Sequence, residues 1–271
     1  MTNLRSITCI CMLLLCTPSL RAQQSPVYGG FDHVAIAVAD SVRARDFYAK
    51  VFGAEVWKDR AAERYYLQLG QSHVALEVQD EPRIDHIGFG VEGFDATAAQ
   101  RWLAAQGIAW LDAAGSSAPV VVADRDGIRT QLAPDDTWEQ VSTTLATRDE
   151  GSDAAAPVFT AYAIDEVFMM VRNLEVDSLF YSRLLDQTGT LQAGALWYRV
   201  GQAARLRLTQ APVGQTPGIA YFSVHVAYTD MEAAADAVFA AGGIIENILP
   251  NGFSFWDPDG IRVVVRSGDL Y

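Results

Sequence analysis

The chain carries one sequence pattern twice, once in each half. Residues 31–38 (FDHVAIAV) are followed by the segment DFYAKVFG, and residues 164–171 (IDEVFMMV) are followed by the similar segment LFYSRLLD. The turn sequence DRDG at residues 124–127 returns as DPDG at residues 257–260, with the same offset between its copies. The repeat therefore predicts two tandem copies of one scaffold, and the residues that differ between the copies indicate which of them carries a working site.

Length and composition allow two domains of ordinary size. The chain has 271 residues, and half of them are apolar, which is enough to fill two hydrophobic cores. The formal net charge is −13. Because so acidic a surface repels nucleic acid and anionic lipid, neither is an expected partner.

The first 22 residues have the pattern of a secretory signal peptide. Arg5 supplies a basic start, residues 7–15 form a short apolar run, and residues 20–22 offer a cleavage site. A buried first helix is the weaker interpretation, because a polar and glycine-containing stretch follows. We therefore expect export to the periplasm or the medium, and no membrane span in the mature protein. All the cysteines of the chain lie in this leader: Cys9, Cys11 and Cys16.

Each half of the remaining chain is predicted to contain two units of a strand, a helix and three further strands. The expected domains are residues 29–134 and 161–268, and the Thr-, Asp-, Ala- and Ser-rich residues 135–160 between them are expected to be an exposed linker. A parallel, doubly wound sheet is disfavoured, because three short strands follow each helix and no glycine-rich phosphate loop is present. The clearest predicted helices are residues 41–52, 95–106 and 231–241, and the clearest strands are residues 32–39, 65–69, 72–79, 85–91, 119–123 and 128–132.

Three stretches, FDHVAIAVADSVRARDFYAKVFGAEV, IDHIGFGV and DRDGIRTQL, resemble the vicinal oxygen chelate superfamily. This group includes glyoxalase I, methylmalonyl-CoA epimerase, extradiol dioxygenases and the bleomycin- and fosfomycin-resistance proteins. The resemblance covers about residues 30–134 and again 161–268. It implies an α+β fold of tandem βαβββ modules, in which two domains each form an open, curled β-sheet cup flanked by helices. It also implies a metal on the cup floor, but it does not select a reaction, because the scaffold supports many chemistries.

The resemblance implies four metal ligands in the amino-terminal half. His33 and Glu77 come from the first and last strands of one module, and His86 and Gln131 come from the matching strands of the next. Each residue alone has a structural explanation: a histidine at a strand start is commonly hydrogen-bonded, and Glu77 could face solvent. Together, two imidazoles, a carboxylate and an amide oxygen suit a divalent metal such as Zn, Fe, Ni or Mn.

Gln131 constrains the chemistry of such a site. Family members usually carry Glu at this position, and in glyoxalases that residue removes a proton from the substrate. Because an amide cannot act as a base, the base here must be Glu77 or a metal-held hydroxide. His73 lies on the same strand face as Glu77, and it either contacts substrate or is a half-exposed strand residue. Tyr65 and Tyr66 point to opposite faces of their strand, so one of the two should line the cup and contact substrate.

The second half lacks this ligand set. The residues that match the four ligand positions are Glu166, an arginine stretch that contains Arg205 and Arg207, Tyr221 and Val264. Valine cannot bind a metal, and arginines repel one. His225 lies on the same strand face as Tyr221 and leaves a degenerate site open. We therefore expect the second half to be a structural partner, or to supply a lid or a wall of the pocket.

Three functions are compatible with these features. The first is a glyoxalase-like lyase or isomerase whose metal binds two adjacent oxygens of a small-molecule substrate. The second is an extradiol-type ring-cleaving dioxygenase, which uses two histidines and a carboxylate to hold Fe(II). The third is a non-catalytic protein that sequesters a small molecule such as a drug. The metal-ligand set favours an enzyme, with lyase or isomerase chemistry first. Whether the halves pair within one chain or exchange within a homodimer is left open.

Overall fold

The structure is a computed structural model that describes residues 25–111, 119–135, 137–149, 158–227 and 230–268. The predicted signal peptide and its three cysteines lie outside these residues. No helix in the described part of the chain is long and apolar enough to cross a membrane.

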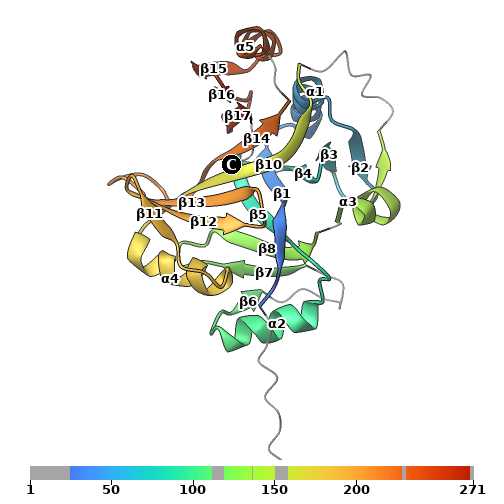
Figure 1. Cartoon of the computed structure of the whole chain (residues 1–271). Coiled ribbons are helices and arrows are strands. Elements are labelled where there is room, and N and C mark those ends of the chain that lie inside the picture. Colours follow the sequence, from blue (N-terminus) through green and yellow to red (C-terminus); the bar gives the residue numbers. More distant parts are fainter. Residues whose placement is uncertain (1–24, 112–118, 136, 150–157, 228–229, 269–271) are drawn as a thin grey trace, which may run out of the picture.

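The amino-terminal half consists of two modules, each with a first strand, a helix and three further strands (Figure 1). In order along the chain they are β1 (Tyr28–Val38), α1 (Ser41–Phe52), β2 (Val56–Asp59), β3 (Arg64–Leu69) and β4 (Ser72–Val78), then β5 (Arg83–Val91), α2 (Ala96–Ala105), β6 (Trp110–Leu111), β7 (Val120–Ala123) and β8 (Arg129–Pro134).

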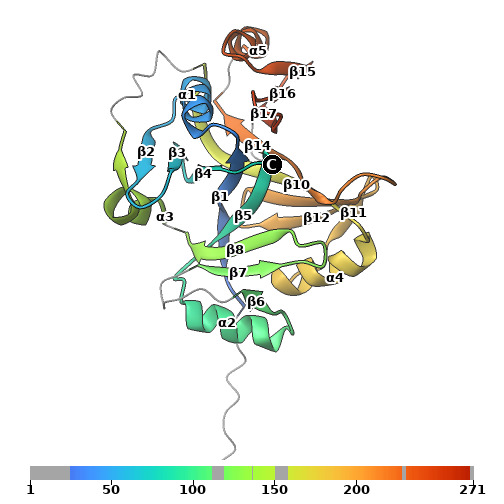
Figure 2. The ribbon, with the colours of Figure 1, turned by 180° about the vertical axis from the view of Figure 1, so that it is seen from behind.

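The carboxy-terminal half repeats this order, so the predicted α+β fold of tandem βαβββ modules is confirmed (Figure 2). Its elements are β10 (Ala161–Val171), α4 (Leu174–Leu184), β11 (Thr190–Gln192), β12 (Ala195–Val200) and β13 (Ala204–Gln210), then β14 (Gly218–Val226), α5 (Met231–Ala240), β15 (Ile244–Leu249), β16 (Gly252–Trp256) and β17 (Arg262–Ser267).

Strand pairing places four strands at the floor of each cup. β1 pairs in parallel with β4 and antiparallel with β5, and β5 pairs in parallel with β8. The second half has the same arrangement, with β10 between β13 and β14, and β14 next to β17. Side chains that alternate on these strands face either the cup or the core. A pairing of Ile84 with Ile219 joins the sheets of the two halves.

Helix α1 shows how local sequence sets these elements. The Asp40 side chain accepts hydrogen bonds from the backbone N–H groups of Val42 and Arg43, both at 3.0 Å, and so caps the first turn. Gly53 follows the last turn with a φ of 62°, a left-handed conformation that glycine adopts without a steric penalty. The predicted helix over residues 41–52 is confirmed at both ends.

The repeated motifs hold the two halves together through reciprocal contacts. The Tyr48 hydroxyl on α1 donates a hydrogen bond to Asp257 Oδ2 at 2.8 Å, and the Tyr181 hydroxyl on α4 donates one to Asp124 Oδ2 at 2.9 Å. Tyr181 is the counterpart of Tyr48 in the sequence repeat, and Asp257 is the counterpart of Asp124. Each helix therefore packs on the Asp-x-Asp-Gly turn of the other half, so the halves pair within one chain.

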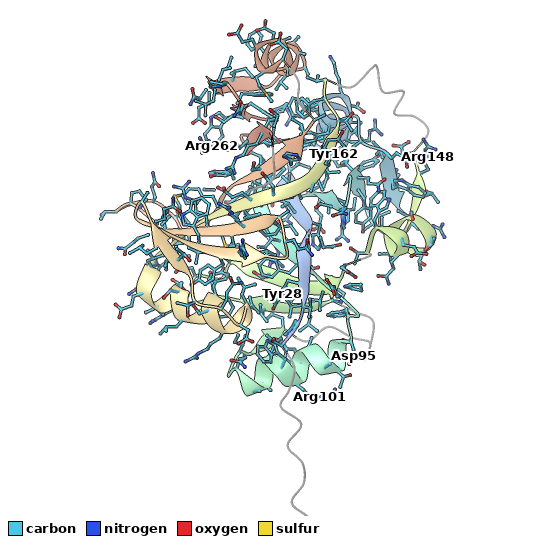
Figure 3. The ribbon with its side chains drawn as sticks, in the orientation of Figure 1. Tyr28, Asp95, Arg101, Arg148, Tyr162 and Arg262 are labelled. Atoms are coloured by element: carbon cyan, nitrogen blue, oxygen red, sulfur yellow. The ribbon has the colours of Figure 1, made fainter. Side chains whose placement is uncertain are left out.

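The glycine turns make a second reciprocal contact. Gly70 lies against the backbone of Tyr162 on β10 (Figure 3), and the N–H of Gln71 donates to the Tyr162 carbonyl at 3.1 Å. In the matching place, Gly201 lies against the backbone of Gly29 on β1. Each β-turn thus touches the first strand of the opposite half, and both strands begin at this contact.

Part of the predicted linker forms helices and a strand, which the prediction did not include, although several of its side chains are exposed. α3 (Thr137–Gln140), a π-helical turn η1 (Val141–Leu145) and β9 (Ala146–Arg148) follow β8, and β9 pairs antiparallel with β2. The physical reason is an apolar series, Trp138, Val141 and Leu145, which the surrounding polar residues obscure in a composition-based prediction. This series faces the first cup.

Candidate metal centre

A cavity of about 300 Å³ lies in the cup of the amino-terminal half. The four predicted metal ligands all line it, and so do two of the three predicted substrate contacts. Tyr65, the third, is buried in the main hydrophobic core instead. The residues predicted from sequence that line the cavity are His33, Tyr66, His73, Glu77, His86 and Gln131.

His33 is held by the aspartate that precedes it. His33 Nδ1 lies 2.6 Å from Asp32 Oδ2, and the other Asp32 oxygen accepts a hydrogen bond from the Thr137 hydroxyl. With Nδ1–H donating to the carboxylate, the lone pair of His33 lies on Nε2. This is the arrangement in which a metal-ligating histidine is oriented by an outer carboxylate.

His86 has the same arrangement. Its Nδ1 lies 2.8 Å from Asp85 Oδ2, and Asp85 also pairs with Arg83 and Arg129. Burial alone would raise the pKa of Asp85, but the hydrogen bond with His86 and the charge of Arg129 lower that pKa to about 2. Asp85 is therefore ionised at neutral pH. The Asp-His dipeptide at both strand starts is a sequence signal that the ligand prediction did not use.

His86 also contacts two of the other predicted ligands. The His33 and His86 rings lie edge to face, with centroids 5.3 Å apart. Gln131 Nε2 lies 2.9 Å from His86 Nε2, so the amide donates to the imidazole lone pair in this arrangement. Rotation of the amide by half a turn brings its oxygen to the same place, where it would serve as a metal ligand.

His73 belongs to the same cluster. It lies opposite His33 in the β1–β4 register, and the two rings stack with centroids 5.0 Å apart. Burial is the main reason that its pKa falls to about 4; Asp32 opposes this shift, and His33 and His86 add to it. The imidazole is therefore neutral at pH 7, and its Nδ1 has no hydrogen-bond partner among the described residues. Its chemistry suits a third imidazole ligand.

Glu77 lies in the cavity but not at the predicted ligand position. Gln131 is opposite Gly88, two residues beyond His86, and the residue placed in the same way relative to His33 is Ala75. Glu77 lies two residues further along β4, and its carboxylate pairs with Arg64. The prediction assigned Glu77 to this position from the motif alone. Glu77 lies two residues beyond the position on β4 that corresponds to Gln131.

One group of side chains in the described residues offers three ligand atoms within 4.8 Å of one another: Asp32, His33 and His73. Both oxygens of Asp32 already accept hydrogen bonds, one from His33 and one from Thr137. We therefore assign Asp32 to orienting His33, not to binding the metal. The donors that remain are the imidazoles of His33 and His73. The imidazole of His86, which is outside the 4.8 Å group, and the amide of Gln131 line the same cavity, and the chemistry of these four donors suits a divalent transition metal.

Polar side chains line the wall of the cavity next to Glu77. Arg64 Nη1 donates to the Tyr66 hydroxyl at 3.2 Å, and that hydroxyl donates to Asp59 Oδ2 at 2.8 Å. Tyr66 is thus fixed on the cup side of β3. Tyr65 faces the other way, where the Arg45 guanidinium lies 5.1 Å from its ring centroid.

The ordered part of the predicted linker covers one side of the cup. The Trp138 ring centroid lies 5.9 Å from that of His73, and Val141 and Leu145 line the cavity. The three imidazoles beside this wall are buried, which strengthens electrostatic interactions there. Residues of the predicted linker therefore cover this side of the cup, a role that was one of the two expected of the second half.

The second half has no comparable cluster of ligands among the described residues. Tyr221 lies opposite Phe168 and Val264 opposite Ser223, so both occupy the positions predicted for them. The Tyr221 hydroxyl donates to Glu166 Oε1 at 2.5 Å, and the other Glu166 oxygen pairs with Arg266. Glu166 is therefore engaged by its neighbours.

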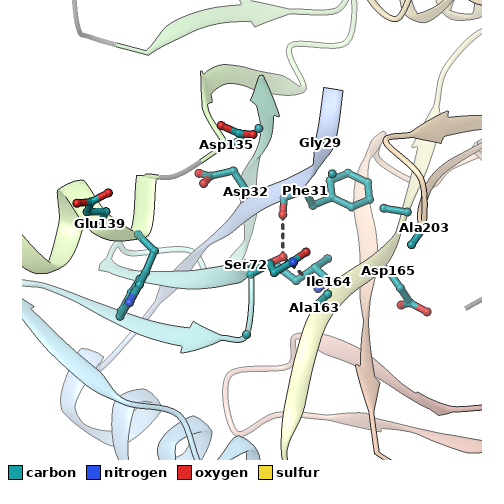
Figure 4. A pocket seen from close by; sticks show the side chains of 16 residues that line it. Gly29, Phe31, Asp32, Ser72, Asp135, Glu139, Ala163, Ile164, Asp165 and Ala203 are labelled. Atoms are coloured by element: carbon teal, nitrogen blue, oxygen red, sulfur yellow. Dashed lines mark hydrogen bonds between the residues drawn. The ribbon is translucent and has the colours of Figure 1, made fainter. Parts of the chain in front are cut away.

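A second cavity, of about 410 Å³, lies between the halves (Figure 4). Asp32 lines this cavity as well as the cup. The Ser72 hydroxyl donates to the Phe31 carbonyl at 2.7 Å and accepts from the Ile164 N–H at 3.2 Å, as the dashed lines show. Ser72 thus ties the strand of His33 to the first strand of the second half.

Removing the carboxylate behind His86 should weaken metal binding without removing a ligand. We expect Asp85→Asn to lower metal affinity by about 10–100-fold, because the amide no longer enforces the tautomer that leaves Nε2 free. Titration of metal-free protein with Zn²⁺ measures this change. Asp95→Asn is the matched control, since Asp95 caps α2 far from the cup, and it should leave the affinity unchanged. Equal affinities for Asp85→Asn and the unmodified chain would remove the orienting role of Asp85.

Comparisons with known proteins agree with this architecture. Residues 30–132 match the family model described as the Glyoxalase/Bleomycin resistance protein/Dioxygenase superfamily. A comparison with curated proteins finds no match. Among solved structures, a catechol 2,3-dioxygenase is 16% identical over 90% of this chain and 89% of its own, with a TM-score of 0.68.

Two further solved structures illustrate the range of relatives. The Mn(II)-bound glyoxalase from Novosphingobium aromaticivorans is 19% identical over 90% of this chain and 83% of its own, with a TM-score of 0.66. The 2,3-dioxygenase LapB from Pseudomonas sp. KL28 is 16% identical over 90% of this chain and 93% of its own, with a TM-score of 0.62. Similarity at these identities shows a shared fold and does not choose between the two activities.

Proposed function

We propose that this chain, whose residues 30–132 belong to the glyoxalase/bleomycin resistance protein/dioxygenase superfamily, is a metal-dependent enzyme that acts on two adjacent oxygens of a small substrate. The observation that carries the proposal is the pair of facing imidazoles, His33 and His86, each oriented by its own aspartate. His73 and Gln131 would complete the ligand set. When bound, the metal would act as a Lewis acid toward the substrate oxygens.

The ligand set favours a lyase or isomerase over a dioxygenase. Non-haem Fe(II) oxygenases use two histidines and one carboxylate. In the described part of this cup, Asp32 and Glu77 are the carboxylates that line the cavity, and each is already paired, with His33 and with Arg64. The fourth ligand position holds an amide, Gln131. Proton transfer on carbon needs no carboxylate ligand, and it is the chemistry that this set supports best.

Glu77 is the residue that we assign to proton transfer. It lines the cavity four residues beyond His73 on β4, outside the imidazole cluster, and Arg64 fixes its carboxylate. A carboxylate held in this way can accept a proton from a substrate that extends from the imidazoles towards Arg64. Tyr66 stands beside it and would orient the same end of the substrate.

Replacement of Glu77 should separate catalysis from metal binding. We expect Glu77→Gln to lower kcat by about 100-fold or more, because the amide is isosteric but cannot accept the proton. Metal content, measured by elemental analysis, should stay at the level of the unmodified protein. Asp80→Asn, the same carboxylate-to-amide change at an exposed position shortly after β4, is the control and should leave both quantities unchanged. Loss of metal in Glu77→Gln would mean that Glu77 is a ligand after all.

A substrate screen distinguishes the proposed reaction from ring cleavage. α-Keto aldehydes, vicinal diols and catechols would be supplied with and without dioxygen to protein loaded separately with Zn²⁺, Mn²⁺, Ni²⁺ or Fe²⁺. The proposal expects turnover without oxygen uptake. Oxygen uptake on catechols with Fe²⁺ would instead support the dioxygenase alternative. Tight binding of a small molecule by metal-free protein, with no turnover, would support sequestration.

Export of the mature protein is a separate part of the proposal. Residues 1–22 have a basic start, an apolar run and a plausible cleavage end at residues 20–22, which together are typical of a cleaved secretory leader. Amino-terminal sequencing of the protein from its producing cells should find a start close to residue 23. A start at Met1 would contradict export by this route.

A further inference from the structure

The carboxy-terminal half has its own cavity, of about 520 Å³, at the place that corresponds to the candidate metal centre. It lies over β10, β13, β14 and β17, the counterparts of β1, β4, β5 and β8. Within the described residues, the charged side chains that line it are all arginines: Arg207, Arg262 (labelled in Figure 3) and Arg266. The chain as a whole has a net charge of −13, so this cavity is opposite in sign to the rest of the molecule.

Two of these arginines form ion pairs with glutamates that lie outside the cavity. Arg262 Nη2 lies 2.6 Å from Glu246 Oε2, and Arg266 Nη2 lies 2.8 Å from Glu166 Oε2. Neither glutamate lines the cavity. The pairing fixes the two guanidinium groups, while the cavity wall itself presents cations and no carboxylate in the described residues.

Arg207 differs from them, because it forms no ion pair with the residues that the structure describes. Its guanidinium carbon lies 4.6 Å from the Phe168 ring centroid and 5.2 Å from that of Trp197. Nη1 donates to the Tyr221 hydroxyl at 3.3 Å, and Nε is buried without a hydrogen-bond partner. The nearest carboxylate in this network, Glu166, is reached only through the Tyr221 hydroxyl. Aromatic faces attract a cation only modestly, so a guanidinium without a direct carboxylate partner remains available to an anion.

The rest of the lining is apolar or uncharged. Phe168, Leu249 and Val264 contribute apolar surface, and the amides of Asn247 and Asn251 are also part of the lining. Apolar walls with a few convergent polar groups are typical of sites for small organic ligands. Bare inorganic anions would leave most of this surface in contact with water.

We infer that this cavity binds a small organic carboxylate with an apolar or aromatic body. The carboxylate pairs with Arg207, the one lining arginine without a carboxylate partner in the described structure, and the body lies against Phe168 and Val264. A single carboxylate matches a single unpaired guanidinium. The second cup therefore carries an anion-binding set on the four strands that correspond to those of the candidate metal centre. This site does not depend on the function proposed for the first cup.

Calorimetric titration of the full chain tests the inference with four probes. Benzoate should bind, and the neutral isostere benzamide should bind about 10–100-fold more weakly, because it lacks the charge-assisted hydrogen bonds. Acetate and inorganic phosphate should also bind more weakly than benzoate, since neither has an apolar body. Equal affinity for benzoate and benzamide, or tighter binding of phosphate than of benzoate, would overturn the inference.

Variants locate the site. Arg207→Met keeps the length and apolar stem of the side chain and should weaken benzoate binding by about 10-fold or more, with metal content unchanged. Arg207→Lys should recover part of the affinity, and it also serves as the test if Arg207→Met does not fold. Arg199→Met, at an exposed position of β12, is the control and should bind benzoate normally. Benzoate binding that survives Arg207→Met, or that is lost in His86→Ala, would place the anion elsewhere and contradict the inference.

Discussion

Replacement of His86 by alanine should abolish stoichiometric metal binding. The change removes the Nε2 donor that faces His33 and Gln131, and it leaves Asp85 without its imidazole partner. Loss of an outer-shell partner alone costs about 10–100-fold in metal affinity, so loss of the ligand itself should exceed about 100-fold. His33→Ala should have an effect of the same size. Metal content after dialysis and Zn²⁺ titration both measure it.

The control for this experiment is a histidine in the second half. His225 lies on β14, the counterpart of the strand that carries His86, but the described residues of its half form no group of potential metal ligands, whereas His86 lines the cavity that also holds His33 and His73. His225→Ala should therefore retain the metal content of the unmodified chain. Full retention of metal by His86→Ala would contradict the site assignment, and loss of metal in His225→Ala would move the site to the second half.

Gly70→Ala should destabilise the whole molecule, because it disrupts a contact between the halves. Gly70 has a φ of 62°, and a Cβ there would lie 1.9 Å from the Tyr162 carbonyl oxygen. The left-handed conformation costs about 1–2 kcal/mol for a residue with a side chain, and displacement of the opposing backbone adds about 1–3 kcal/mol. We expect a loss of about 3 kcal/mol in the free energy of unfolding, measured by urea denaturation.

Two further glycines calibrate this result. Gly201 is the counterpart of Gly70, with a φ of 68° and a Cβ position 2.2 Å from the Gly29 carbonyl oxygen, and Gly201→Ala should cost a similar amount. Gly214 also has a positive φ, of 87°, but its Cβ would meet nothing within 4 Å. Gly214→Ala should cost only about 1 kcal/mol, from its backbone conformation alone. If all three variants lost the same stability, the contacts between the halves would contribute nothing measurable.

The sequence predicted the fold well, because the repeated motifs occur in both halves of the chain. Equal spacing of the Phe-Tyr helix and the Asp-x-Asp-Gly turn identified the two halves, and the structure shows why both motifs recur: Tyr48 meets Asp257, and Tyr181 meets Asp124. Short strands were not located individually. β2 has four residues and β6 has two, which is too few for alternation to be visible in a sequence.

The candidate site was predicted in part. His33, His86 and Gln131 line one cavity, as expected from their positions relative to the strand starts and the glycine turn, and their metal binding stays a prediction. Glu77 was assigned to a ligand position that Ala75 occupies, two residues earlier on β4. The sequence of an isolated strand shows which face a residue occupies but not which residue of the neighbouring strand lies opposite. His73 was assigned to the correct face, but its stacking on His33 depends on that same register.

The walls of the site could not be predicted, because they depend on tertiary packing. Trp138 reaches His73 from a segment whose composition is typical of a linker. The buttressing aspartates were visible as two Asp-His dipeptides, yet their role follows only from the hydrogen bonds at 2.6 Å and 2.8 Å to the Nδ1 atoms. Likewise, the arginines of the second cup indicated a lost metal site, whereas the anion site required their cavity and their partners.

Elemental analysis of the washed protein, isolated from its producing cells, tests the central claim most directly. The convergence of His33, His73 and His86 in one cup predicts one equivalent of a divalent transition metal per chain, lost in His86→Ala and kept in His225→Ala. A protein that contains no stoichiometric metal, and that takes up none from solutions of Zn²⁺, Mn²⁺, Ni²⁺ or Fe²⁺, would contradict the claim that these imidazoles form a metal centre.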